Sequence, residues 1–151
     1  MKLSQGVEWS MHCAVTLAQT APGVSVSRRT LAERYDLPEA YLAKHLKAMV
    51  SAGLLHATTG PRGGFRLARA AEEITVLDVV EAVEGSGPQF VCQEIRQRGT
   101  AALPPEQCRE RCGVALALDS AAEAWRSSLR TVTVADIVAR LPAGARVQIQ
   151  A

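Results

Sequence analysis

The chain of 151 residues is 48% hydrophobic and 21% charged, which is typical of a folded globular domain and excludes disorder throughout. It has no apolar run near the roughly 18 residues of a membrane-spanning helix, and its N-terminus lacks the apolar segment of a secretory signal. The net charge of +2 is uneven: residues 1–69 hold nine Lys and Arg against four Asp and Glu, net +5, and residues 70–151 hold eight against eleven, net −3. This distribution indicates that the first half meets a polyanion.

Three helices are predicted in the first third of the chain. Residues 7–19 carry apolar side chains on one helical face, and residues 28–35 form a shorter second helix for which Ser27 is a suitable N-cap. A third helix is predicted over residues 38–52, with Pro38 in its first turn and an apolar stripe at helical spacing.

A hairpin is predicted directly after the third helix. Residues 54–58 and 65–68 are short β-capable runs that flank a turn rich in Gly and Pro. Two tight helices, a basic third helix and a hairpin, in that order, are typical of a winged helix-turn-helix. We therefore expect a mainly α fold, with three helices and a two-stranded wing in the first half.

The second half is predicted to be helical around an irregular loop. Thr75 and Asp78 have the spacing of a capping box at the start of a fourth helix. Residues 86–106 look irregular, residues 112–130 form a long Ala-rich helix, and Thr133 caps a last short helix. The expected organisation is a winged helix-turn-helix DNA-binding region over 1–69, helix four with the cysteine-containing loop and dimerisation helices over 70–141, and a flexible tail over 142–151.

The third helix and its neighbours carry the candidate DNA contacts. A recognition helix presents its N-terminal residues to base edges, while basic groups nearby hold phosphates. Glu39 and Tyr41 are the candidates for reading bases, because a carboxylate repels phosphate but accepts a hydrogen bond from cytosine. Each basic residue taken alone is as readily explained as a solvated side chain, so the inference depends on the whole group. The other candidates are Ser27, Arg28, Arg29, Lys44, His45, Lys47, Arg62 and Arg66, with His45 expected at the surface.

Six runs of sequence resemble the IscR/NsrR/RsrR family of winged-helix regulators: MKLS at 1–4, LAER at 31–34, YL at 41–42, AGL at 52–54, GPRGGFRLA at 60–68 and EITVLDVVEAVEG at 73–85. The resemblance extends over about residues 1–137. It implies a homodimeric repressor or activator that binds double-stranded DNA and dimerises through the long helix after the cysteine loop. Many members of this family hold an iron–sulfur cluster whose state alters DNA binding.

The cysteine positions resemble one branch of that family. The IscR and NsrR kind has three cysteines close together, whereas here Cys92 precedes Cys108 by sixteen positions. Four runs resemble instead the RsrR branch, whose 2Fe–2S cluster has Glu, His and two Cys ligands: GVEWSMHC at 6–13, FVC at 90–92, EIRQRG at 94–99 and PPEQC at 104–108. Carried over residue by residue, the resemblance implies the ligands Glu8, His12, Cys108 and Cys112, with the two pairs supplied by different subunits.

The spacing of these residues is compatible with metal binding on physical grounds. Glu8 and His12 are four positions apart on one helix, so both side chains leave the same face. Cys108 and Cys112 have the same spacing near the start of the long helix, where a helix N-terminus favours thiolate. The same residues are also compatible with a structural zinc ion or with a thiol-based sensor. The resulting hypothesis is a redox-sensing regulator whose cluster state controls operator binding, with zinc or thiol chemistry as the alternative.

Several residues near these ligands have simpler explanations. Without an export signal we expect a cytoplasmic protein with reduced cysteines, of which Cys13 is a buried apolar residue. Cys92 is either a second buried thiol or a ligand or reactive thiol. Trp9 is a packing residue, with the alternative that its indole lies near the cluster and shifts with redox state. Glu8 and His12 taken alone fit a first-turn acid and a core histidine. We do not expect an enzyme, because the sequence has no nucleophile motif and no phosphate loop.

Overall fold

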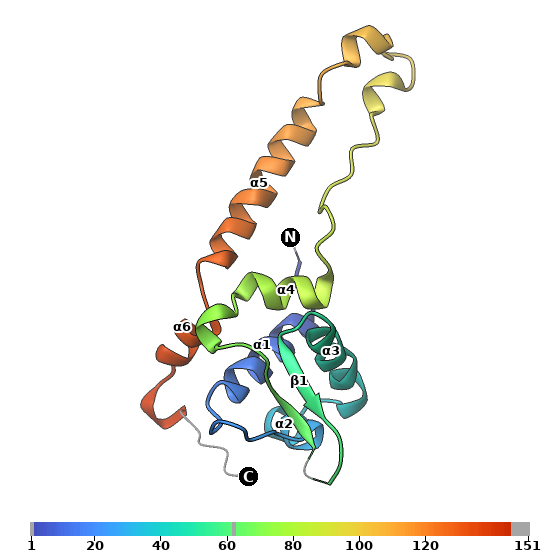
Figure 1. The fold of residues 1–151 in the computed structure, drawn as a ribbon. Coiled ribbons are helices and arrows are strands. Elements are labelled where there is room, and N and C mark those ends of the chain that lie inside the picture. The colour runs from blue at the N-terminus through green and yellow to red at the C-terminus, as the bar shows by residue number, and fades with distance from the viewer. Residues whose placement is uncertain (1, 62, 146–151) are drawn as a thin grey trace. The chain divides into compact units, whose positions relative to one another are not determined.

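The computed structural model describes residues 2–61 and 63–145, which fold into two compact units. The first unit comprises Met1–Ser86 and Leu129–Ala151, and the second comprises Gly87–Ser128. Helices α4 and α6 thus pack in the same unit as the first three helices, although the sequence suggested a division after residue 69. The elements in chain order are α1 (Gln5–Leu17), α2 (Arg28–Tyr35), α3 (Glu39–Ser51), β1 (Leu55–Thr58), β2 (Gly64–Leu67), α4 (Val76–Glu84), α5 (Gly113–Arg130) and α6 (Val134–Ala139) (Figure 1).

The first unit is a winged helix-turn-helix, as predicted. Strands β1 and β2 pair in antiparallel fashion, with Leu55 opposite Leu67. The wing is attached to the chain before α2 by two backbone hydrogen bonds between Val26 and Phe65, of 2.9 and 2.8 Å. Gly64 is required at this junction, because a Cβ there would collide with the Val26 backbone. The hairpin is therefore held against the helices at its base.

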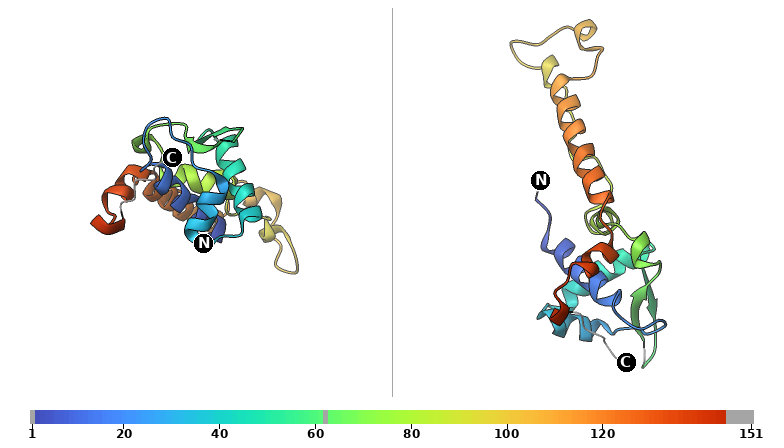
Figure 2. Two further views of the ribbon diagram at one scale, coloured as in Figure 1. Left: turned by 90° about the horizontal axis from the view of Figure 1, so that it is seen from below. Right: turned by 90° about the vertical axis from the view of Figure 1, so that its left-hand side faces the viewer.

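The core of the first unit is formed by all of its helices and the base of the wing. Helix α6 lies beside α1 (Figure 1, Figure 2) and returns the C-terminal part of the chain to this core. Two backbone hydrogen bonds of 2.8 Å, from Val76 to Val132 and from Val134 to Ile74, join the chain at the start of α4 to the chain at the start of α6. The largest side chains without solvent exposure are Leu31, Leu42, Leu46, Met49, Ile74, Val79 and Val134.

Three predicted helix caps are confirmed. The Ser27 hydroxyl accepts a hydrogen bond from the backbone N–H of Thr30 at 3.0 Å, at the start of α2. Thr75 and Asp78 form a reciprocal capping box at α4, with bonds of 2.8 and 3.1 Å. Thr133 opens α6 with the same arrangement. Each of these bonds satisfies a backbone N–H that the helix itself leaves free.

Two predicted helices differ from the structure at their boundaries by one or two residues. Helix α1 begins and ends two residues earlier than predicted. Beyond its C-terminal end, the side chains of Gln19 and Thr20 donate hydrogen bonds to the carbonyls of Val15 and Leu17 and so compete with a further helical turn. Pro38 is not in the first turn of α3 but is its N-cap, because its ψ of 109° is extended. The helix accordingly begins at the next residue.

The second unit consists of the cysteine-containing loop and most of α5. The loop is irregular, as predicted, apart from short 3-10 helices at Ile95–Gln97 and Pro105–Cys108. Helix α5 begins one residue later than predicted and exposes Val114, Leu116 and Leu118. None of the helices formed by the described residues is long and apolar enough to cross a membrane.

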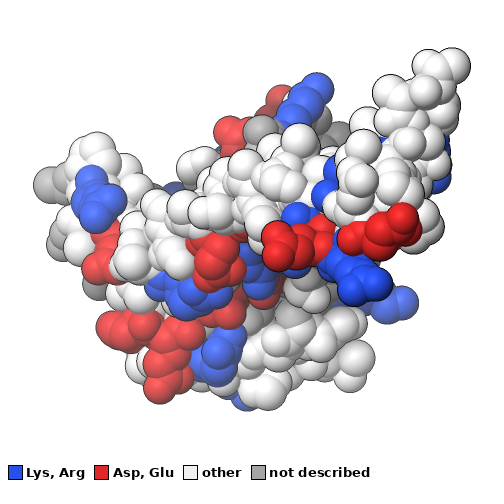
Figure 3. Space-filling model, turned by 90° about the horizontal axis from the view of Figure 1, so that it is seen from above, with Lys and Arg blue, Asp and Glu red and all other residues white. Residues whose placement is uncertain are grey.

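On the face drawn in Figure 3, basic and acidic side chains are interspersed and form no patch of one sign.

The predicted flexible tail lies largely outside the described residues. Residues 146–151 are not described, and Ala143–Ala145 form a short 3-10 helix just before them. The expectation for this segment therefore stays a prediction.

Candidate nucleic-acid interface and metal half-sites

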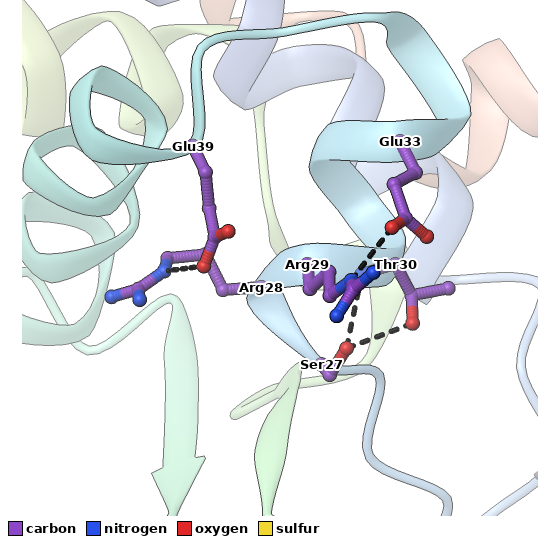
Figure 4. Close-up of polar contacts among 6 residues, drawn as sticks. All are labelled: Ser27, Arg28, Arg29, Thr30, Glu33 and Glu39. Carbon is purple, nitrogen blue, oxygen red and sulfur yellow. Dashed lines mark hydrogen bonds and ion pairs between the residues drawn. The ribbon is translucent and has the colours of Figure 1, made fainter.

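An ion pair joins the first turns of α2 and α3. The Arg28 Nε donates to Glu39 Oε1 at 2.7 Å, and both side chains are about half exposed (Figure 4). Arg29 makes a second ion pair of 2.7 Å with Glu33, one turn along α2. Glu39, the predicted base reader, thus has a protein partner in the free chain. A DNA phosphate near Arg28 would compete with this carboxylate for the guanidinium.

Four other candidates for DNA contact are exposed. Tyr41 is 69% exposed on the first turns of α3, so its ring is accessible to a partner. Lys44 and Lys47 are exposed on the same helix, and Arg66 is exposed on β2. Arg62 at the wing tip lies outside the described residues.

His45 differs from these residues, because it was expected at the surface and is partly buried. Its ring packs edge-on against Trp9 of α1, with centroids 5.9 Å apart, and a Cβ at Gly6 would collide with it. Position 45 borders the buried stripe of α3 and therefore faces α1. Burial lowers the pKa of His45, and the charge of Lys44 lowers that pKa further.

The predicted ligands on α1 share one small cavity. Glu8 and His12 line a hollow of about 190 Å³ together with Trp9, Tyr35 and Leu37. Both ligand side chains are exposed, so their donor atoms are accessible. The spacing of four residues had indicated a common face, and the cavity lining agrees with it.

Tyr35 is a residue at this site that the sequence reasoning missed. Its ring centroid lies 5.3 Å from that of His12, and its hydroxyl donates to the His12 carbonyl at 3.2 Å. The same hydroxyl is 2.6 Å from the hydroxyl of the buried Thr16. Tyr35 is the last residue of α2, so it links the helix-turn-helix to the helix that carries Glu8 and His12. No local pattern marks it, because its partners lie about twenty residues away.

The two predicted cysteine ligands lie at the start of α5. Cys108 ends the 3-10 helix Pro105–Cys108, and Cys112 immediately precedes α5. The backbone N–H groups of Ala115 and Val114 lower the pKa of the Cys112 thiol, and the Arg96 guanidinium adds to that effect. The predicted preference of this helix end for thiolate is therefore supported for Cys112.

The other two cysteines differ sharply in exposure. Cys13 is fully buried, as predicted, and burial raises the pKa of its thiol to about 12. Cys92 is exposed, which contradicts the buried alternative. It lines an apolar cavity of about 470 Å³ in the second unit, together with Cys112 and Arg96.

Each pair of predicted ligands is incomplete by itself. Among the described residues of one chain, no group of three or more His, Cys, Asp or Glu side chains is placed to hold a metal ion. A four-ligand site formed by these residues therefore needs both pairs.

Comparison with known proteins identifies the family. The model of the Rrf2 family, described as an iron-dependent transcriptional regulator, matches residues 3–140. The chain belongs to the Rrf2 family. It is 30% identical to the protein rrf2 of Nitratidesulfovibrio vulgaris over 141 residues, which cover 91% of this chain and 87% of that protein. It is 40% identical to the transcriptional regulator IscR of Cereibacter sphaeroides over 86 residues, which cover 56% of each.

The fold agrees with that of solved family structures. The solved structure of T. potens IscR matches with a TM-score of 0.70 at 24% identity, over 98% of this chain and 93% of that one. As a member of the Rrf2 family, the chain is a DNA-binding transcription regulator and not an enzyme. Its fold is a mainly helical winged helix-turn-helix with a two-stranded wing and a long C-terminal helix.

Proposed function

We propose that this Rrf2-family regulator is a homodimer that senses redox state through a 2Fe–2S cluster, and that the state of the cluster controls operator binding. In this proposal Glu8 and His12 of one subunit and Cys108 and Cys112 of the other are the ligands. The observation that carries it is the cavity on α1 that Glu8 and His12 line together. A family that includes iron-dependent regulators and a resemblance to the RsrR branch support the same assignment.

The donor set suits such a cluster. Thiolates are the usual ligands of iron–sulfur clusters, and histidine replaces two of them at one iron in Rieske centres. The backbone N–H groups at the start of α5 favour the thiolate form of Cys112, as a ligand must be deprotonated. A bound cluster would supply one-electron oxidation and reduction, and imidazole ligation would raise its potential.

A homodimer would contain two complete sets of cluster ligands. Each chain carries one Glu–His pair and one Cys pair, so two-fold symmetry yields two equivalent sites. The exposed apolar side chains Val114, Leu116 and Leu118 of α5 support dimerisation through this helix, because such side chains are usually covered by a partner.

The contacts of α1 supply a route from the ligands to DNA. Tyr35 bonds the His12 carbonyl at the end of α2, and Trp9 packs on His45 of the recognition helix α3. A displacement of Glu8 or His12 would therefore act on both helices of the helix-turn-helix. We retain the hypothesis that Trp9 shifts with redox state. Half-sites on DNA lie about 34 Å apart, so small changes in the spacing of two recognition helices alter affinity.

The proposed DNA contacts follow the exposed residues. Glu39 and Tyr41 would read bases in the major groove, and Arg28 would exchange its bond to Glu39 for a phosphate. His45 is the weakest candidate, since its ring packs on α1. The remaining proposed phosphate contacts are Ser27, Arg29, Lys44, Lys47, Arg62 and Arg66.

Anaerobic purification followed by visible spectroscopy and operator binding in both redox states tests the proposal. We expect a coloured protein with iron and sulfide and a redox-dependent affinity. Cys108→Ala should abolish the colour and the redox dependence, whereas Cys92→Ala is the matched control that should retain both. Iron and colour that persist in Cys108→Ala contradict the ligand set. A colourless protein with stoichiometric zinc supports the alternative of a structural zinc site at the same residues.

A further inference from the structure

Arg96 ties together the two sides of the cysteine-containing loop. Its Nε and Nη2 donate to the two carboxylate oxygens of Glu94 at 2.5 and 2.8 Å. The same Nη2 donates to the carbonyl of Glu110, which lies midway between Cys108 and Cys112, at 3.0 Å. Three-quarters of the Arg96 side chain is shielded from solvent, unlike an ordinary surface arginine. One guanidinium thus joins the turn at Glu94 to the backbone between the two cysteines.

The backbone at Glu94 is arranged for this contact. Glu94 adopts a left-handed conformation, with φ 49° and ψ 50°, which residues other than glycine rarely adopt. The turn brings its carboxylate alongside the guanidinium only two positions further on, in the bidentate geometry that arginine forms with carboxylates. Leu103 also donates to the Arg96 carbonyl at 2.7 Å, so the backbone of Arg96 is held as well as its side chain.

The charge of Arg96 acts on both cysteines. Its ion pair with Glu94 is the main cause that raises the pKa of Arg96, and the nearby sulfurs of Cys108 and Cys112 raise that pKa further. The guanidinium therefore lies within electrostatic reach of both sulfurs. Lysine would retain the charge but lacks the planar set of donors that reaches Glu94 and the Glu110 carbonyl together.

We propose that Arg96 is a positioning residue for the Cys108 and Cys112 pair: it holds the two sulfurs side by side and presents a positive charge to the group that they bind. The identity of that group as a 2Fe–2S cluster rests on the proposed function. The positioning role concerns the two thiols alone and can be tested without a cluster.

An arsenic(III) probe tests the positioning in the metal-free, full-length protein. Phenylarsine oxide condenses with two neighbouring thiols: two As–S bonds replace the As=O bond, and the oxygen leaves as water with both thiol protons. The titration is done in the Cys92→Ala background, so that the partly exposed Cys108 and Cys112 are the thiols accessible to the probe, and mass spectrometry of peptides locates the adduct. We expect one equivalent to bind there.

The variants separate geometry from charge. Arg96→Gln and Arg96→Lys should both weaken arsenical binding by about tenfold or more, since each loses the bidentate contact. Glu94→Gln should act in the same direction, and Arg98→Gln, at an exposed arginine two positions away, should bind as the parent does. Equal denaturation curves show that the variants fold. Parent-like affinity in Arg96→Gln, or no adduct at these two cysteines in the parent, overturns the proposal.

The cluster-loaded protein gives a second measurement. A positive charge stabilises the reduced state of a cluster, so Arg96→Gln should make the midpoint potential more negative, and Arg96→Lys should leave it near that of the parent. An unchanged potential in Arg96→Gln contradicts the charge part of the proposal. A parent protein that never holds a cluster contradicts the proposed function, whereas the arsenical titration still decides the role of Arg96.

Discussion

Removal of the Tyr35 hydroxyl tests how firmly α2 is attached to the helix that carries Glu8 and His12. Tyr35→Phe retains the ring that packs on His12 and deletes only the oxygen that bonds Thr16 at 2.6 Å and the His12 carbonyl at 3.2 Å. Thr16 is 2% exposed, so water cannot readily replace the lost partner. The change therefore leaves a buried hydroxyl unpaired.

The expected cost follows from these contacts. A hydrogen bond contributes about 0.5–1.5 kcal/mol net, and an unpaired buried partner costs about 1–3 kcal/mol. Because the Thr16 hydroxyl loses its partner, the loss for Tyr35→Phe should be about 1–3 kcal/mol. Thr16→Val should cost about 0.5–1 kcal/mol, because Tyr35 retains its bond to His12. In the double variant no buried hydroxyl lacks a partner, so its loss should fall short of the sum by about 1 kcal/mol.

Urea unfolding followed by circular dichroism measures the four free energies of this cycle. All four proteins are compared at one concentration, because the stability of a dimer depends on concentration. Each kcal/mol corresponds to a fall of about 2–4 °C in Tm for a chain of this size. Losses that simply add, within about 0.3 kcal/mol, refute the coupling of Tyr35 to Thr16.

Three further predictions concern other contacts. Gly6→Ala should lower stability by about 1–3 kcal/mol in thermal unfolding, because the new methyl group meets the His45 ring; helix propensity alone predicts a gain, so a more stable variant contradicts this packing. Arg28→Ala should weaken binding to all operator sequences alike and reduce the salt dependence of binding by about one phosphate contact. Glu39→Gln should instead alter the base preference measured by binding-site selection. The reverse pattern would exchange the roles of the two residues. Burial raises the pKa of the Cys13 thiol from 9.0 to about 12, so the thiol loses its proton at lower pH in the unfolded chain than in the folded one. The free energy of unfolding should therefore fall between pH 9 and 12, and Cys13→Ala should show a smaller fall over that range. An equal dependence on pH in the two proteins would refute the burial of this thiol as the cause.

Helix caps and helix faces were determined by the sequence alone. Ser27, Thr75 and Thr133 cap their helices as predicted, because a capping bond joins residues three positions apart and depends on little beyond the local chain. The same reason applies to Glu8 and His12: a spacing of four residues places two side chains on one helical face in any packing arrangement. The order of these elements was then sufficient to predict a winged helix-turn-helix.

The partners of individual side chains were decided only by the tertiary structure. His45 borders a buried stripe, and whether solvent or a ring covers it depends on where α1 crosses α3. Tyr35 and His12 lie 23 positions apart in the sequence, and Arg28 and Glu39 lie 11 apart. The contact of Arg96 with the Glu110 carbonyl spans 14 residues. Apolar faces set how the segments pack, and polar side chains at the edges of those faces then bond to whichever groups the packing brings within reach.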